Sequence, residues 1–294
     1  MNHNTLSFRQ IAIALGTTLL IAGIIVAIGV ISGANSSEKK AENNKKNASP
    51  ITQTAERPVK VATKRPTANL NKSAHTFDYL KKPFTAFIFD VTQQQLNFSL
   101  HNAKGANYST LTAVTDTLEK MGNKVLFATN AGIFAPDQQP EGLFVANGEV
   151  LTELNLEKGK GNFYLQPNGV FFLTKAGKLG VLPSKTFAEQ DVAVTYATQS
   201  GPLLLRNDTI HEAINQGSPN LRVRNGVGII SPTKAVFVIS EIPVNFYDFT
   251  MVFKDYFGCR DALYLDGVIS EIYLPELERT ESKGEFAGII SVTD

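Results

Sequence analysis

Residues 262–274 read ALYLDGVISEIYL, two apolar runs that flank Asp266-Gly267. Two such runs around an Asp-Gly pair are typical of antiparallel strands joined by a tight type I′ turn. In a second interpretation, Asp266 is a catalytic carboxylate at a strand tip, and Gly267 lets a substrate approach the backbone. The two interpretations predict opposite outcomes for Asp266→Asn, because Asn keeps the turn but removes the negative charge.

Strand and turn patterns extend outward from this stretch. We predict strands at 86–91, 96–100 and 125–128, and strand pairs at 143–146 with 150–154, 163–165 with 170–174, 192–197 with 203–205, 227–230 with 235–239, and 262–265 with 269–273. Ser109 is expected to cap a helix that Gly122 ends, and a second helix with a phenylalanine stripe begins at Asn245 and stops at Gly258. The predicted class is α+β, with a curved, mostly antiparallel sheet and a few packed helices.

The composition argues against several classes of function. The 294 residues are 43% hydrophobic and 19% charged, with a net charge of +1, as in an ordinary globular protein. Nucleic-acid binding normally shows a clear basic excess, so no nucleic-acid partner is predicted. The single Cys259 permits no intrachain disulfide and reads as a small buried hydrophobe. The four histidines are scattered without zinc-ligand spacing, so we predict no cofactor and no metal, although an oxygen-ligand Ca²⁺ or Mg²⁺ site stays open.

The N-terminal part is typical of an export or membrane-anchoring segment followed by a linker. After the flank 1–10, residues 11–31 carry no charge and would form a helix of about 31 Å, long enough for a transmembrane anchor. Small residues at 32–34 also suit a cleaved signal peptide, so that alternative stays open. Residues 32–76 are polar and predict a disordered linker, which places the folded domain at 77–294.

Two polar segments at strand ends are candidates for ligand contact. Asn130 and Gly132 follow a short buried strand, where Asn130 either presents its amide to a sugar hydroxyl or tolerates the positive φ of a turn. Glu141 opens the next strand as either an exposed loop acid or a catalytic base.

Two more segments carry anion-binding residue types. Ser200 and Gly201 interrupt two strands, so their backbone N–H groups either meet an anion or form a bulge. Arg222 and Arg224 alternate along a strand, which suits a phosphate fork or a solvated edge.

Taken in order, these segments resemble the phosphodiester glycosidase family from about residue 84 to residue 290. The motifs that carry the resemblance are TNAGIF (129–134), PEGLFVANG (140–148), SGPLLL (200–205), RNGVGI (224–229), VFVIS (236–240), VNFYDF (244–249) and ALYLDG (262–267), with Ser270. In this chain Val268 and Ile269 replace the second glycine of the family's usual Asp-Gly-Gly, and Asn225 begins an unusual variant of its motif. These departures leave the natural substrate open.

The resemblance implies a hydrolase that breaks the bond between a sugar's anomeric carbon and a phosphodiester oxygen. The leaving phosphate monoester has a second pKa of about 6 and departs as an anion, so the site needs a phosphate cradle more than a strong acid. Asp266 is the first choice for the catalytic carboxylate and Glu141 the second. The expected substrate-binding residues are Asn130, Gly132, Ser200, Gly201, Arg222, Arg224, Asn245, Gly267 and Ser270, with Arg224 and the Ser200-Gly201 backbone as the phosphate cradle.

The family is largely exported, which predicts a membrane-anchored domain on the extracytoplasmic (periplasmic or cell-surface) side, acting on a phosphoglycan or cell-envelope polymer. The lysines at 39, 40, 45 and 46 conflict with this orientation, because the positive-inside rule would hold them in the cytoplasm. The alternative function is a non-catalytic glycan- or cell-wall-binding module on the same fold, which would tolerate loss of Asp266.

Overall fold

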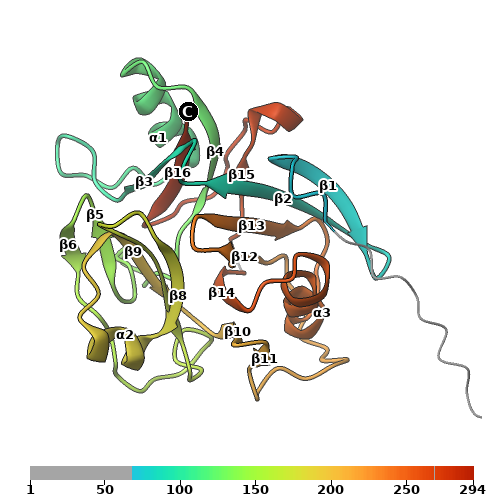
Figure 1. The fold of residues 1–294 in the computed structure, drawn as a ribbon. Coiled ribbons are helices and arrows are strands. Elements are labelled where there is room, and N and C mark those ends of the chain that lie inside the picture. Colours follow the sequence, from blue (N-terminus) through green and yellow to red (C-terminus); the bar gives the residue numbers. More distant parts are fainter. Residues whose placement is uncertain (1–67, 268) are drawn as a thin grey trace, which may run out of the picture. The chain divides into compact units, whose positions relative to one another are not determined.

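The computed structural model describes residues 68–267 and 269–294, and their strands form three sheets in which every pairing is antiparallel (Figure 1). The seven-stranded sheet has the order β1 (Ala74–Tyr79), β2 (Lys82–Asp90), β13 (Lys234–Ser240), β12 (Asn225–Ser231), β14 (Asp261–Asp266), β10 (Leu203–Arg206), β11 (Thr209–Ile210). The four-stranded sheet has the order β15 (Ile272–Tyr273), β4 (Val125–Asn130), β16 (Ile289–Thr293), β3 (Gln95–Ser99). The five-stranded sheet has the order β6 (Glu149–Thr152), β5 (Phe144–Ala146), β9 (Val194–Ser200), β7 (Gly169–Thr174), β8 (Leu179–Pro183).

The helices are few and short. They are α1 (Leu111–Lys120), α2 (Ser184–Gln190) and α3 (Phe246–Met251), with a π-helical turn η1 (Val252–Tyr256) that continues α3 and a 3₁₀ turn η2 (Pro275–Leu277). The predicted α+β class and antiparallel pairing are confirmed, but three sheets replace the single curved sheet.

One aromatic core joins the three sheets. The ring of Phe127 in β4 stacks on Phe87 of β2 at 4.7 Å, and Phe237 of β13 meets Phe171 of β7 edge-on at 5.7 Å. These side chains are almost fully buried, and each contributes about 1.5–3 kcal/mol by its transfer from water. The core therefore holds the three sheets against one another.

Both predicted helices are present, with one change of cap. Asn245 caps α3, since its side-chain oxygen accepts the Asp248 N–H at 2.8 Å, and the phenylalanine stripe packs on the seven-stranded sheet. Figure 1 shows α3 beside the strands of that sheet. Thr110 rather than Ser109 caps α1, because Thr110 has the extended backbone of a cap whereas Ser109 has a φ of 64°. The Thr110 hydroxyl accepts the Ala113 N–H at 3.1 Å.

Two hairpins closed by short turns were predicted correctly. The 143–146 and 150–154 pair is β5–β6, whose turn residues Asn147 and Gly148 both have positive φ. The pair 227–230 with 235–239 is β12–β13.

Three predicted pairings are wrong, one because a predicted strand is absent and two because the chain changes sheet between the strands. Residues 163–165 form no strand, and 170–174 instead lies in β7, between β8 and β9. After β9, a turn with a cis Gly201-Pro202 bond carries β10 into the seven-stranded sheet. After β14, the chain crosses to the four-stranded sheet, where β15 pairs with β4.

The folded part begins earlier than predicted. Strand β1 starts at Ala74, so residues 74–76 of the expected linker belong to the sheet, because they pair with 85–87 of β2. Within the described residues, no helix has the length and apolar character needed to cross a bilayer. The predicted segment 11–31 and most of the linker lie outside the described residues.

Candidate active site

Asp266 ends β14, an interior strand of the seven-stranded sheet. Strand β14 pairs with β12 on one side and β10 on the other, so no edge is left for β15. The predicted type I′ turn at Asp266-Gly267 is therefore wrong, and the alternative position at a strand tip is what the structure contains. Asp266 is only 8% exposed, and one of its carboxylate oxygens accepts the Gly267 N–H.

A buried amide connects Asp266 to two other strands. The side-chain nitrogen of Asn225, at the start of β12, donates to Asn130 Oδ1 at 3.0 Å and to Thr129 Oγ1 at 2.9 Å. The side-chain oxygen of Asn225 accepts the Asp266 N–H at 2.8 Å and the Ser270 hydroxyl at 3.3 Å. We call Asn130, Asn225, Asp266 and Ser270 the strand-end cluster.

Asn130 and Ser270 have further contacts that hold the cluster together. Asn130 Oδ1 also accepts the Glu271 N–H at 3.2 Å, and Ser270 Oγ donates to the main-chain oxygen of Asp266 at 2.9 Å. The structure thus brings together three residues predicted as site residues, namely Asn130, Asp266 and Ser270. Asn225 was missed as a site residue, although its place between Arg224 and a glycine at the start of an apolar strand was a usable signal.

Ser200 and Gly132 pack against the main chain next to this cluster. Ser200 Oγ donates to the main-chain oxygen of Leu265 at 2.7 Å and accepts the Ile133 N–H at 3.2 Å. A Cβ on Gly132 would lie 2.2 Å from the Gln199 oxygen, so this close approach of two main chains requires glycine. These contacts give both residues a structural role next to Asp266.

Gly201 and Gly267 are also packed tightly. A Cβ on Gly201 would lie 2.7 Å from the Phe163 oxygen, and a Cβ on Gly267 would lie 1.7 Å from the Tyr264 hydroxyl. Gly267 therefore makes room for Tyr264 of the preceding strand β14. Burial raises the pKa of that Tyr264 phenol, and the neighbouring Asp266 carboxylate adds to the rise.

Arg224 is fully buried, and its guanidinium contacts protein groups. Nε donates to the Val244 oxygen at 2.8 Å, Nη2 to the Asn220 oxygen at 2.9 Å, and the group lies 3.6 Å over the Phe246 ring. Burial lowers the pKa of Arg224 from its usual high value. Arg222 is exposed and donates to the Leu221 oxygen, so the two arginines do not form a solvent-facing pair.

Two other predicted site residues have local partners. Asn245 uses its side-chain oxygen to cap α3. Glu141 accepts the Tyr164 hydroxyl, and that hydrogen bond is the main reason the pKa of Tyr164 is raised. The Glu141 N–H donates to Ile133, whose own N–H reaches Ser200, so a chain of hydrogen bonds leads from Glu141 to the Leu265–Asp266 strand end.

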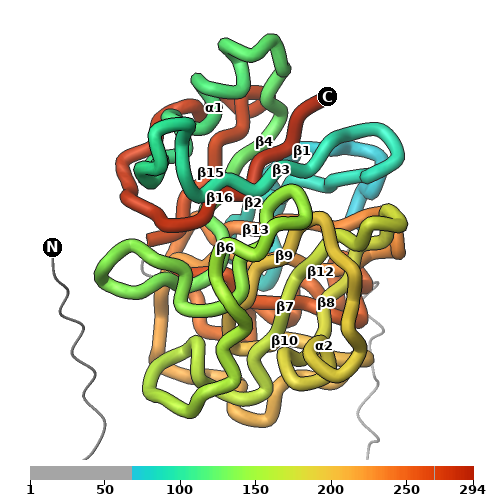
Figure 2. The backbone as a smooth tube through the Cα atoms, turned by 90° about the vertical axis from the view of Figure 1, so that its left-hand side faces the viewer, coloured from blue at the N-terminus to red at the C-terminus, as the bar shows by residue number. Residues whose placement is uncertain are grey.

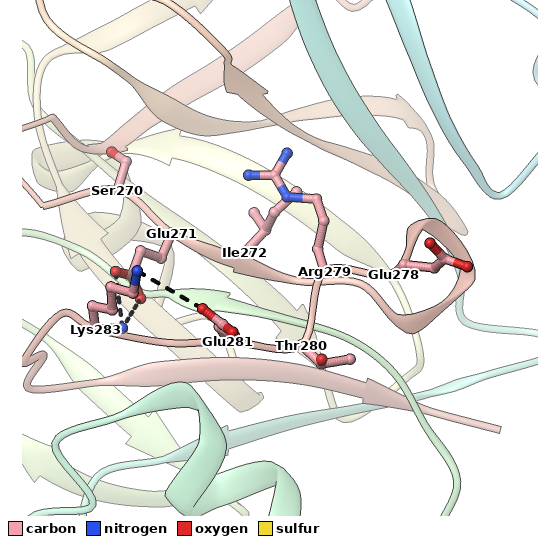
Figure 3. A pocket seen from close by; sticks show the side chains of 8 residues that line it. All are labelled: Ser270, Glu271, Ile272, Glu278, Arg279, Thr280, Glu281 and Lys283. Atoms are coloured by element: carbon pink, nitrogen blue, oxygen red, sulfur yellow. Dashed lines mark hydrogen bonds and ion pairs between the residues drawn. The ribbon is translucent and has the colours of Figure 1, made fainter.

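An open cavity of about 420 Å³ borders the strand-end cluster at Ser270. Its lining comes from residues 270–283, and we call it the 270–283 cavity (Figure 3). Among the described residues, no three His, Cys, Asp or Glu side chains are grouped as metal ligands. Cys259 is buried, and burial raises the pKa of its thiol.

The sequence over residues 123–283 matches the family model for phosphodiester glycosidases, and this range contains every predicted site residue. The chain belongs to the phosphodiester glycosidase family, a family of hydrolases.

Among its relatives, the uncharacterized protein YigE of Escherichia coli K12 is 34% identical over 189 residues, which cover 64% of this chain and 73% of YigE. The zebrafish N-acetylglucosamine-1-phosphodiester alpha-N-acetylglucosaminidase catalytic domain, in a structure described as auto-inhibited by its pro-peptide, shares the fold with a TM-score of 0.53 at 14% identity, covering 78% of this chain and 87% of that one. A hypothetical protein from Synechocystis has a TM-score of 0.50 at 12% identity, covering 75% and 61% of the two chains.

Proposed function

We propose that this domain is a glycosidase that cleaves sugar-1-phosphodiesters, with Asp266 as its catalytic carboxylate. The observation that carries the proposal is a buried carboxylate at the end of β14, held by an amide that also binds β4. Such a preorganised group at the meeting point of several strands is typical of active sites. The family supplies the reaction class.

In the proposed reaction, the bond between the anomeric carbon and the phosphate oxygen breaks, and that oxygen keeps the electron pair. Water supplies the new oxygen on the sugar and loses a proton. Asp266 either attacks the anomeric carbon or accepts that proton, and its charge stabilises the oxocarbenium-like transition state in both routes. Because the phosphate monoester leaves as an anion, the site needs no strongly acidic group on the leaving side.

The remaining predicted residues are assigned different roles because their contacts differ. Asn130 and Ser270 lie beside Asp266 and are proposed to contact the sugar. Glu141 stays the second candidate for the carboxylate role, with Tyr164 as its partner. Arg224 is proposed to hold the start of β12 rather than to receive phosphate, since its donors already bind Val244, Asn220 and Tyr264.

The full chain should be incubated with a panel of sugar-1-phosphodiesters in ¹⁸O-labelled water, and the products identified by mass spectrometry. The expected products are a free sugar that carries the label and an unlabelled phosphate monoester. Label in the phosphate would mean cleavage at phosphorus and would overturn the glycosidase proposal. Binding without release of either product would instead support the glycan-binding alternative.

We also propose that the domain acts outside the cytoplasm on a cell-envelope phosphoglycan and is tethered by residues 11–31. The length of the uncharged stretch supports this. N-terminal sequencing of protein extracted from membranes tests the tether, because a mature terminus at residue 35 would mean a cleaved signal peptide.

A further inference from the structure

The 270–283 cavity holds an arginine in a fixed position. Arg279 forms a two-residue bridge with Leu274, in which the Leu274 N–H donates to the Arg279 oxygen at 2.6 Å and the Arg279 N–H returns a bond at 3.2 Å. This bridge closes the η2 turn, so two main-chain hydrogen bonds hold the backbone at Arg279. Arg279 is thus positioned before any ligand arrives.

The guanidinium of Arg279 keeps donors for a ligand. Its Nη1 donates to Glu241 and to Thr85 Oγ1, and its side chain is 34% exposed. Among residues 68–267 and 269–294, no partner accepts from Nε or Nη2. Figure 3 shows the group extending past Ile272 toward Ser270, which belongs to the strand-end cluster.

Among the described residues, Arg279 pairs with the carboxylate of Glu241 and with none of the three carboxylates that line the cavity, Glu271, Glu278 and Glu281. Glu271 turns back on the chain, where its oxygens accept the Lys283 and Gly284 N–H groups and the Ser282 hydroxyl. The Lys283 and Glu281 side chains are 85% and 84% exposed and 3.8 Å apart, so water screens them. Arg279 is the partly buried cation of this cavity.

We propose that the 270–283 cavity is the leaving-group subsite and that Arg279 binds the phosphate. The proposal rests on the glycosidase function proposed above and deepens it. The planar guanidinium suits two phosphate oxygens, and the cavity begins at Ser270, beside Asp266. The phosphate would lie between Ser270 and Arg279 as the bond to the sugar breaks, while Arg224 stays beneath as a structural residue.

The test compares wild type with Arg279→Ala and Arg279→Lys. We expect Arg279→Ala to lower kcat/KM for a sugar-1-phosphodiester by about 10- to 150-fold, the usual effect of losing hydrogen bonds to a charged group. Titration of each full-length protein with inorganic phosphate should show a matching loss of affinity. Arg279→Lys should restore only part of either property, because lysine lacks the planar fork.

Two further variants separate phosphate binding from structure. Arg206→Ala is the matched control, since Arg206 is also 34% exposed and paired with one carboxylate, Asp261, at 3.0 Å, but does not line the cavity. It should leave kcat/KM and phosphate affinity unchanged. If Arg279 served only to pair with Glu241, Glu241→Gln would reproduce the Arg279→Ala defect; for a phosphate ligand, Glu241→Gln leaves kcat/KM unchanged or raises it.

The possible failures are distinguishable. Wild-type turnover with undiminished activity and phosphate affinity in Arg279→Ala would overturn the subsite and leave the glycosidase function standing. No turnover by wild type, with phosphate binding that depends on Arg279, would reject the glycosidase function and support the anion site. Neither turnover nor phosphate binding by wild type would reject both.

Discussion

Asp266 is held by Asn225 and not by a hairpin turn. The oxygen of the Asn225 side chain accepts the Asp266 N–H, while the nitrogen of the same amide reaches Asn130 on β4. A buried amide with both ends paired has one preferred orientation, because a flipped amide would place donor against donor. The position of the carboxylate therefore depends on a residue whose own side chain carries no charge.

The change Asp266→Asn tests the catalytic carboxylate. We expect turnover of a sugar-1-phosphodiester to fall by orders of magnitude, because the charge is lost while the shape is kept. The thermal midpoint should stay near that of wild type, since Asn can still accept the Gly267 N–H. Asp137→Asn, on a loop where Asp137 accepts the Gln139 N–H, is the control and should keep full activity. Full activity of Asp266→Asn would shift attention to Glu141.

Arg224→Lys tests the structural role of Arg224. Lysine cannot donate to Val244, Asn220 and Tyr264 together, and it loses the stacking on Phe246. Lost hydrogen bonds from a buried charged group cost about 1.5–3 kcal/mol, so the free energy of unfolding should fall by an amount of that order. Urea unfolding measures this change, with Arg206→Lys as the control because Arg206 is partly exposed. An unchanged unfolding free energy together with lost activity would return Arg224 to the phosphate cradle.

At the scale of elements, sequence patterns predicted the features that residues close together in the sequence determine. Helix α3 has its cap and its stripe within one segment, and the β5–β6 turn is specified by Asn147-Gly148. The partner of β14 could not be read in the same way, because β10 and β12 reach it from distant parts of the chain. The strand-tip position of Asp266 was one of two interpretations of its sequence, and the fold was needed to choose it and to show the contacts of Asn225.

Strand β1 makes stability depend on pH. His75 of β1 is buried beside Phe77 and Phe257, and neither imidazole nitrogen has a hydrogen-bond partner of normal geometry among the described residues. Burial lowers the pKa of His75, and the positive charge of Lys72 lowers it further. The unfolded chain, with a pKa near 6.5, binds the proton first as pH falls, so the free energy of unfolding decreases below about pH 6.5.

His75 is expected to change the free energy of unfolding by at most about 1.4 kcal/mol per pH unit. Urea unfolding between about pH 5 and pH 8 measures it, and His75→Phe should flatten the curve. His211 has a pKa lowered by burial as well and contributes with the same sign, so a smaller slope should remain. Identical slopes for wild type and His75→Phe would contradict this origin.

At the scale of the whole folded part, the last strand is internal. Strand β16 lies between β3 and β4, and Figure 2 shows the red C-terminal segment beside both. Ile289 pairs with Asn130 of the strand-end cluster, and the Ala131 N–H donates to the Gly288 oxygen at 2.9 Å. The site thus includes main chain from the final residues of the sequence.

Deleting residues 289–294 should abolish cooperative unfolding, because β3 loses its pairing partner and β4 loses one of its two. Removing Asp294 alone is the control and should shift the thermal midpoint by only a few degrees, since this exposed residue follows the strand. Circular dichroism during heating distinguishes the two. A sharp transition in the longer deletion would show that β16 is dispensable.

The internal position of β16 also affects the order in which the described part of the chain can fold during synthesis. At about 5–20 residues per second, β16 emerges about 8–32 s after β4, so the four-stranded sheet is completed late. Until then β3 and β4 present unpaired edges that other chains or chaperones can bind. A product that terminates before residue 289 lacks part of the framework around Asn130, so it should lack the activity proposed for the strand-end cluster.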